Sequence, residues 1–440
     1  MDLPATGIDP DALLALLGDL GRDDVDWRAG RGWSLVYDSP DWHHALVREA
    51  AARFADENAL SHTAFPSAAH FESRVVGMVA SVVAPGTTSH GIFASGGTES
   101  TMIALKAYRD RAPSTASPAR VVVPVTAHPA FGKAAAYLGL DLVEVAVGDD
   151  GLPAVDAVLD AIDDHTVVVG LSAPNYPFGV VDPIAEIAGA LRGRGVGVHV
   201  DAALGGLFLP FLADAGAAAA PAFGLDVAGV TSVAVDLHKY GYGAKGASVV
   251  LFADDDLRHA AYHVSTGWPG GAYASSGVLG TRSVGTAAAA FTAMAALGRA
   301  GYVELVRGVL DTTRRLQEGL AERGPLRVIG APPMSVFAVT SDEIPLGALA
   351  HGLQQRGWSI DAQGPPPSIH FIVFPRHAGV VEEFLADLEG ALDEARGPGA
   401  APDAPLLSYG VMVRGGGSVT RRGLWAHLDA RFDGTGPSAP

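Results

Sequence analysis

The chain of 440 residues contains no cysteine. Disulfide bonds, thiolate metal sites and thiol nucleophiles are therefore excluded. Basic residues are also scarce. The chain has 30 Lys and Arg and 48 Asp and Glu, which gives a formal net charge of −18. This deficit argues against a nucleic acid or an anionic membrane as partner, since either would need a basic surface. An anionic ligand would need a local cluster of Lys, Arg and His.

Long apolar runs and targeting signals are missing as well. The most apolar stretch, at about 215–235, is interrupted by Pro221 and Asp226, so we expect no membrane-spanning helix. The N-terminus has no basic segment followed by an apolar one, and a cytoplasmic protein is therefore expected. The 15 histidines include no His-Glu-x-x-His pattern, and no metal site is predicted.

Short β-branched runs alternate with helix-like segments between about 90 and 255. The runs lie at 121–123, 167–169, 196–200, 232–235 and 247–252. This alternation predicts an α/β fold in which helices cover both faces of a mostly parallel sheet. Ligands of such sheets bind at the carboxyl ends of the strands, which is where Asp201, His238 and Lys239 fall.

The remaining segments predict a division of the chain into four parts. Residues 1–60 resemble an N-terminal arm, 61–300 a large α/β domain and 301–433 a smaller α+β domain. The smaller domain has predicted helices at 302–323 and 380–395 and predicted strands at 335–340 and 369–374. Residues 434–440 are rich in Gly, Pro and Ser, which predicts a disordered tail.

A lysine and an aspartate follow two of the predicted strands. Lys239 stands in Asp236-Leu237-His238-Lys239-Tyr240, and Asp201 ends the run His199-Val200-Asp201. Such a lysine can form a Schiff base with the aldehyde of pyridoxal 5′-phosphate, while a carboxylate can keep the pyridine nitrogen protonated. The alternatives are a solvated lysine and a helix-capping aspartate.

The apolar run before Lys239 favours a buried amine with a depressed pKa. Lys245 is the competing lysine, but its Gly243-Ala244-Lys245-Gly246 loop is better suited to contact with a ligand anion.

Three further segments fit a cofactor site. Ser95-Gly96-Gly97-Thr98 opens a helix, where backbone N–H groups and the Thr98 hydroxyl can bind a phosphate, although a plain helix cap would use the same residues. His128 follows a strand, so its ring could stack on the pyridine or be purely structural. Asn175 could orient the phenolic oxygen of the cofactor or form a turn.

The chain resembles the sphingosine-1-phosphate lyase family, within the pyridoxal-phosphate enzymes of aminotransferase fold type I. Matching segments occur in order along almost the whole chain: 34–37, 60–66, 95–110, 124–133, 172–179, 199–206, 236–246, 266–282 and 367–371. The resemblance implies a large domain with a seven-stranded sheet, a smaller C-terminal domain and a homodimer with shared active sites.

The resemblance also implies a role for each site residue. Lys239 would carry the cofactor, Asp201 would pair with its ring nitrogen and His128 would stack on the ring. The cofactor phosphate would be held by Gly97, Thr98, His238 and a Thr281 that comes from the partner subunit. The substrate phosphate would be bound by Tyr37, His62, Lys245 and Arg282.

Some positions depart from the family pattern. Ala69-His70 replaces an Arg-Lys pair, Gly267 replaces an aspartate, and Ser275-Ser276 and Thr281 replace a Ser-Pro and a serine. These changes leave the predicted cofactor site intact and affect the predicted substrate site.

The implied reaction is the retro-aldol cleavage of a phosphorylated 2-amino-3-hydroxy compound, such as a sphingoid base 1-phosphate, to an aldehyde and phosphoethanolamine. Lys239, His128 or a tyrosine could take the proton of the C3 hydroxyl. One alternative is an amino-acid decarboxylase on the same scaffold, with Arg376 as a weak candidate to bind the carboxylate. The other is a non-catalytic protein that binds pyridoxal phosphate.

Overall fold

The computed structural model describes residues 3–88, 90–113, 115–397, 405–408, 411–414 and 421–432. Its centre is a seven-stranded sheet with the order β1-β7-β6-β5-β4-β2-β3. The strands are β1 His90–Ala94, β2 Arg120–Pro124, β3 Asp141–Val145, β4 Thr166–Ser172, β5 Gly197–Asp201, β6 Ser232–Asp236 and β7 Ser248–Phe252. Neighbours from β3 to β6 pair in parallel, whereas β7 is antiparallel to both β6 and β1. The sequence prediction of an α/β fold with a mostly parallel sheet is confirmed.

Helices cover both faces of this sheet because its strands are apolar on both sides. Val122 packs in one hydrophobic core, and its neighbours Val121 and Val123 pack in the core on the other face. The helices of this part are α3 Pro66–Val83, α4 Gly97–Arg111, α5 Ala130–Leu138, α6 Val155–Asp160, α7 Ile184–Leu191 and α8 Asp255–Ala261. The loops that follow β5 and β6 at their carboxyl ends begin at Ala202 and Leu237.

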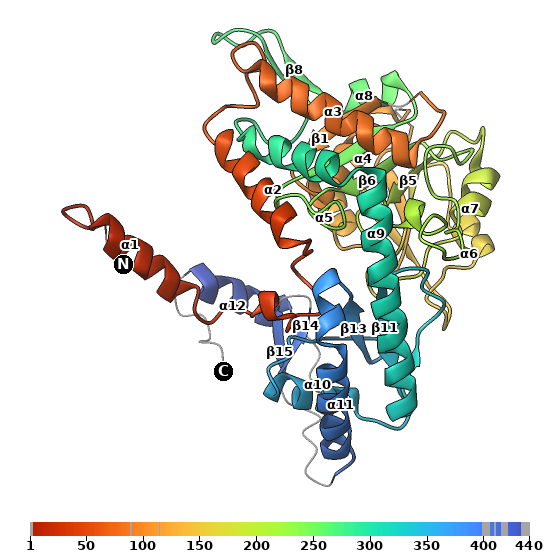
Figure 1. Ribbon diagram of the computed structural model, residues 1–440. Helices are drawn as coiled ribbons and strands as arrows, with labels where there is room; N and C mark the ends of the chain where they lie inside the picture. Colours follow the sequence, from red (N-terminus) through yellow and green to blue (C-terminus); the bar gives the residue numbers. More distant parts are fainter. Residues whose placement is uncertain are drawn as a thin grey trace.

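A four-stranded antiparallel sheet lies beyond the long helix α9, which spans Gly285–Arg323 and connects the two sheets (Figure 1). The helix axis changes direction at Gly298, whose φ of 55° and ψ of −178° are not helical. The second sheet has the order β10-β11-β13-β12. Its elements are β10 Arg327–Val328, β11 Val336–Thr340, β12 Asp361–Gln363 and β13 Ser368–Ile372, with helices α10 Leu346–Gln355 and α11 Val381–Arg396.

The N-terminal segment contacts helix α9 and the part of the chain that forms the four-stranded sheet. Helix α2, Asp41–Arg53, packs against α9, whereas helix α1, Pro10–Leu20, buries none of its residues and stands away from the body (Figure 1). Between them Trp33 is fully buried, and its backbone bonds to Ser359 and Ile372 of the four-stranded part.

Short 3-10 helices lie at Trp27–Ala29, Leu209–Phe211 and Pro375–Gly379. The remaining described elements are two small antiparallel ribbons and one α-helix. They are β8 His263–Ser265 with β9 Tyr273–Ser275, β14 Pro405–Ser408 with β15 Val411–Arg414, and α12 Arg421–Phe432. The predicted tail at 434–440 lies outside the described residues. Among the described helices, none is long and apolar enough to cross a membrane. The predicted domain boundaries stay predictions.

Candidate cofactor and substrate site

Lys239 lies in the loop directly after β6, beside the last residue of that strand. Its Nζ is 3.0 Å from Oδ2 of Asp236, which is only 2% exposed. Burial opposes the positive charge of Lys239, but the carboxylates of Asp236 and Asp201 outweigh this effect and raise its pKa. The depressed pKa expected from the sequence is therefore wrong for the cofactor-free chain, because the strand supplies a buried counter-charge.

The amine of Lys239 faces a small cavity of about 170 Å³. The other lining residues are Leu35, Tyr37, Tyr176, His238, Lys245 and Ile372. Lys245 donates a hydrogen bond to the carbonyl of Leu35 at 2.8 Å, and its Nζ lies 5.3 Å from the centroid of the Tyr37 ring. Burial lowers the pKa of Lys245, and the nearby charge of Lys239 lowers it further. Two of the four predicted substrate residues, Tyr37 and Lys245, thus lie beside the reactive amine.

The predicted phosphate-binding segment begins α4 next to the same loop. A side chain at Gly96 would lie 3.3 Å from the imidazole of His238, and one at Gly97 would lie 3.1 Å from Oδ2 of Asp236. A side chain at either position would crowd these atoms, so the close approach of the two segments favours glycine. The first turn of a helix presents N–H groups without intrahelical partners, which suits a phosphate at Gly97 and Thr98.

Asp201 and His128 reach the site from β5 and from the loop after β2. Oδ1 of Asp201 accepts a hydrogen bond from the amide of Ala203 at 3.0 Å. Burial lowers the pKa of His128, while the charge of Asp201 raises it and that of Lys239 lowers it. The net effect keeps His128 neutral near pH 7, which suits a ring that stacks on a cofactor.

The pieces present fit pyridoxal 5′-phosphate. An amine, a carboxylate and a neutral imidazole meet at the carboxyl ends of β2, β5 and β6, and a glycine-rich helix start lies beside them. The sequence pattern does not single out Asp236, the site residue that stands three positions before Lys239.

Asn175 serves a turn in this structure. Its Oδ1 accepts a hydrogen bond from the amide of Phe178 at 3.1 Å, and its Nδ2 donates to the carbonyl of Gly151 at 3.2 Å. These bonds match the turn alternative, and a contact with the cofactor's phenolic oxygen stays a prediction.

The other two predicted substrate residues meet on a glutamate that the sequence did not single out. Arg282 pairs with Oε1 of Glu72 at 2.6 Å, and His62 lies 3.5 Å from Oε2 of the same carboxylate. Arg282 lines a second cavity of about 160 Å³ with Ser95 and Gly246, whereas Thr281 is exposed. Within one chain, the four predicted substrate residues are therefore divided between two places.

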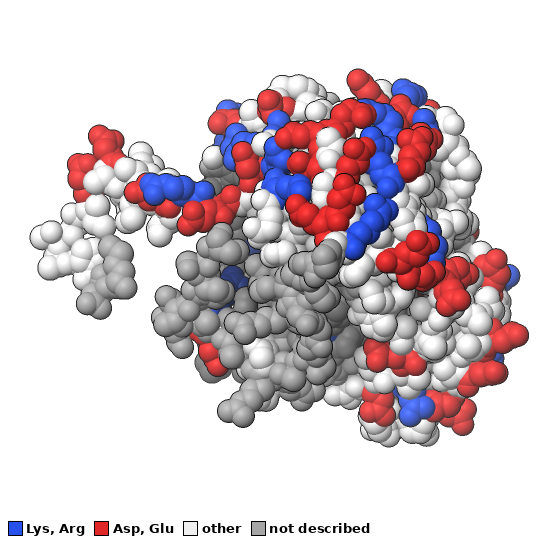
Figure 2. Space-filling model, turned by 90° about the horizontal axis from the view of Figure 1, so that it is seen from below, with Lys and Arg blue, Asp and Glu red and all other residues white. Residues whose placement is uncertain are grey.

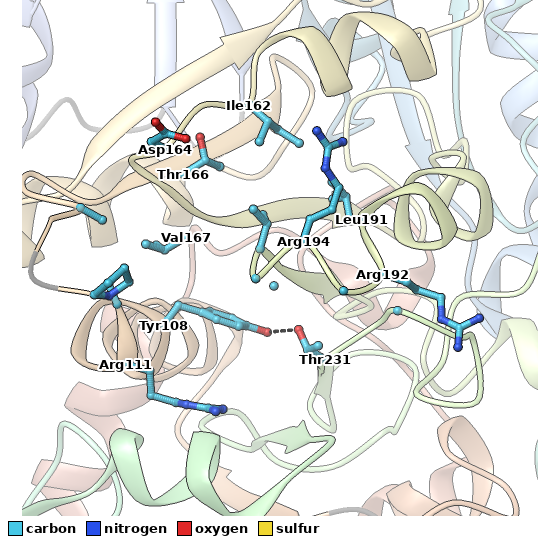
Figure 3. A pocket seen from close by; sticks show the side chains of 18 of the residues that line it. Tyr108, Arg111, Ile162, Asp164, Thr166, Val167, Leu191, Arg192, Arg194 and Thr231 are labelled. Atoms are coloured by element: carbon cyan, nitrogen blue, oxygen red, sulfur yellow. Dashed lines mark hydrogen bonds between the residues drawn. The ribbon is translucent and has the colours of Figure 1, made fainter.

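A larger cavity of about 820 Å³ lies at the opposite, amino-terminal edge of the sheet (Figure 3). The hydroxyl of Tyr108 bonds there to Oγ1 of Thr231 at 2.7 Å, and burial raises the pKa of Tyr108 to about 12. Arg192 and Arg194 border this cavity, but their guanidinium groups point away from each other. Because the two guanidinium groups diverge, they do not form a binding site for a single anion.

Metal and nucleic-acid sites find no support in the part of the chain that the structure describes. No group of three or more His, Asp or Glu side chains there could hold a metal ion. On the face shown in Figure 2, Lys and Arg lie among Asp and Glu and form no continuous basic surface.

Comparisons with known proteins show what the whole chain is similar to. The model of the pyridoxal-dependent decarboxylase conserved domain matches residues 34–338. Sphingosine-1-phosphate lyase of Dictyostelium discoideum is 37% identical over 89% of this chain and 74% of its own length, and the Arabidopsis thaliana enzyme of that name is 34% identical over 98% and 80%.

Solved structures show the same likeness. Sphingosine-1-phosphate lyase of Burkholderia pseudomallei has a TM-score of 0.86 and 35% identity, covering 90% of this chain and 93% of its own. Glutamate decarboxylase of Lactobacillus brevis, at a TM-score of 0.78 and 20% identity over 90% and 95% of the two chains, shares the fold. The chain therefore belongs to the pyridoxal-dependent decarboxylase family, with pyridoxal 5′-phosphate as its cofactor.

Proposed function

We propose that this enzyme is a carbon–carbon lyase that cleaves a sphingoid base 1-phosphate, or a similar phosphorylated 2-amino-3-hydroxy compound, to an aldehyde and phosphoethanolamine. The observation that carries the proposal is the second cation beside the reactive amine. Lys239 and Lys245 line one cavity together with Tyr37. The similarity to three sphingosine-1-phosphate lyases supports the same substrate class.

The cofactor, when bound, supplies an electron sink for the bond that breaks. In our proposal Lys239 holds it covalently, Asp201 keeps its ring nitrogen protonated and His128 packs on its ring. Gly97, Thr98 and His238 bind its phosphate, together with Thr281 of the partner subunit. Asn175 supports the turn that follows β4.

The substrate phosphate is assigned to Tyr37 and Lys245 of one subunit and to His62 and Arg282. Since the latter pair is held on Glu72, away from the cavity of Lys239, we propose that it serves the site of a second copy in a homodimer. Exposed apolar side chains on the segment that leads to Thr281 support such an interface, with Val264 62%, Trp268 59% and Val278 60% exposed.

In our proposal the groups that can take the proton from the C3 hydroxyl are His128, the Lys239 amine and a tyrosine. His128 is neutral near pH 7 because burial lowers its pKa, so it can accept a proton. Tyr37 and Tyr176 line the cavity of Lys239 and can carry a proton between the substrate and that amine.

The decarboxylase alternative is less favoured by the structure. A decarboxylase needs a cation for the substrate carboxylate, and Arg376 was the candidate. Arg376 instead pairs with Asp38 and Asp41, on the N-terminal segment. Its charge is thus already neutralised by two carboxylates.

The test is to supply the purified protein with a long-chain base phosphate, its unphosphorylated counterpart and a panel of amino acids. We expect aldehyde from the phosphorylated base alone. Lys245→Gln should raise the KM for that substrate about tenfold or more, as expected for a lost charged contact, while the exposed control Lys133→Gln should not. Carbon dioxide from an amino acid, without aldehyde from the base, would contradict the proposal.

A further inference from the structure

Glu99 occupies the first turn of α4, within the segment that binds the cofactor phosphate in our proposal, yet sequence reasoning gave it no role. Its side chain is 8% exposed. Oε2 accepts a hydrogen bond from the amide of Ser95 at 2.7 Å. A glutamate at this position of a helix commonly bonds backward in this way as part of a cap.

The second carboxylate oxygen makes contacts that capping does not explain. Oε1 accepts hydrogen bonds from the amide of Val278 at 2.6 Å and from that of Leu279 at 3.2 Å. These residues lie 179 and 180 positions further along the chain. One buried carboxylate therefore joins the start of α4 to the loop that leads to Thr281 and Arg282.

The loop is shaped to admit this carboxylate. A side chain at Gly277 would place its Cβ 2.8 Å from Oε1 of Glu99, closer than such atoms approach. The adjacent Ser275 hydroxyl donates to the carbonyl of Gly277 at 3.1 Å, which fixes the turn from within. The cavity of about 160 Å³ beside this contact is lined by Ser95, Glu99 and Arg282.

We propose that Glu99 is a positioning residue that couples the phosphate-binding turn at Ser95–Gly97 to the 277–282 loop, so that the order of one depends on the order of the other. Hydrogen bonds that a carboxylate accepts from backbone amides are among the stronger ones in proteins, and three partly buried bonds of this kind converge on Glu99. Their loss frees both segments at once. The inference rests on the proposed place of the cofactor phosphate at Gly97 and Thr98.

The test uses the full chain freed of cofactor and two readouts that need no substrate. The first is the Kd for pyridoxal 5′-phosphate, from its absorbance. The second is the rate at which chymotrypsin cleaves after Tyr273 and Leu279. Glu99→Gln should raise the Kd about tenfold and speed cleavage, since it removes the charge and one acceptor. The exposed control Glu186→Gln should change neither.

A double-mutant cycle separates positioning from a general loss of fold. Gly277→Ala should raise the Kd for pyridoxal phosphate because its methyl group collides with the Glu99 carboxylate. In the Glu99→Ala background the collision is absent, so adding Gly277→Ala should leave the Kd of that variant unchanged within about twofold. A merely structural role of α4 would not produce this dependence.

Two results would overturn the inference. One is faster cleavage of the loop in Glu99→Gln with an unchanged Kd, since the segments would then be uncoupled. The other is additive effects of the two substitutions. Neither result depends on turnover, so failure of the proposed lyase activity, seen as normal cofactor binding without aldehyde release, is recognised separately.

Discussion

The ammonium group of Lys239 lies 3.0 Å from the Oδ2 atom of Asp236, and both residues belong to the end of β6 and its following loop. This pair determines the charge of the amine before the cofactor arrives. Burial alone would raise the pKa of Asp236, but the charges of Lys239 and His238 outweigh it and lower that pKa. The pair is thus charged in the cofactor-free enzyme, and the neutral amine that attacks an aldehyde is its minor form.

Asp236→Asn should therefore shift the pH dependence of cofactor attachment. The raised pKa of Lys239 means that attachment accelerates as pH rises, because the neutral amine becomes more abundant. Without the carboxylate, burial of the amine prevails and its pKa falls, so the half-maximal rate should move down by about one pH unit or more. Stopped-flow absorbance between pH 6 and 9 measures this: the parental rate should rise throughout the range because its amine stays protonated, and the rate of Asp236→Asn should be about tenfold or more higher at the same pH. Asp214→Asn, in an exposed pair with Arg299, is the control, and an unmoved profile for Asp236→Asn would contradict the assignment.

The identity of the covalent lysine can be checked directly. Lys239→Ala should leave no cofactor attached after borohydride reduction and denaturation, whereas Lys245→Ala should keep it, because Lys239 lies beside the residues proposed to hold the ring and Lys245 is held on the carbonyl of Leu35. Mass spectrometry of the reduced peptides gives the answer. An adduct that persists in Lys239→Ala would place the attachment elsewhere, with Lys245 tested first.

The positions of Asp201 and Lys239 at the strand ends could be predicted from the sequence for a physical reason. Asp201 and Lys239 follow apolar runs, and the carboxyl ends of parallel strands meet at one edge of a sheet. The same argument could not reveal the charge of the amine. That depends on Asp236 facing the loop that it precedes, which a pattern of residue types does not specify.

The sequence pattern did not reveal one strand of the sheet and the contacts of two glutamates. Only the last residue of the outer strand β3, Asp141–Val145, is buried, and Asp141 and Glu144 are exposed, so this strand lacks the apolar run that marked the inner strands. Glu72 and Glu99 looked like ordinary helix glutamates. Their roles follow from loops some two hundred positions away, which only the folded chain brings into contact.

A buried histidine predicts how the protein responds to acid. His377 stacks on Trp33, accepts a hydrogen bond from the amide of Phe374 and donates one to the carbonyl of Gly32. Burial lowers its pKa to about 4. The unfolded chain thus binds this proton more readily, and stability is lost as pH falls from about 6.5 toward 4.

The lowered pKa of His377 alone should reduce the free energy of unfolding by roughly 2 kcal/mol when the pH falls from 7 to 5. His377→Asn keeps an acceptor for the amide of Phe374 but cannot gain the proton, so its loss of stability over this interval should be smaller by about that amount. Urea unfolding at the two pH values measures the difference. The exposed His259, replaced by Gln, serves as control. An equal loss of unfolding free energy between pH 7 and pH 5 in His377→Asn and in the parent would refute the prediction.

Mixing two inactive variants tests whether active sites are shared between subunits. Thr281 is exposed and follows the loop held by Glu99, so in our proposal it contacts the cofactor phosphate of a second copy. Thr281→Asp should abolish cofactor binding because its carboxylate repels that phosphate, and Lys239→Ala lacks the covalent amine. If Thr281 acts across the interface, a mixed dimer has one site with a native lysine and a native threonine.

Unfolding and refolding the two variants together should then restore about a quarter of parental activity, since half of the dimers are mixed and each has one working site. Mixing without refolding is the control, and no recovery from dimers shown to be mixed would mean that Thr281 serves its own subunit.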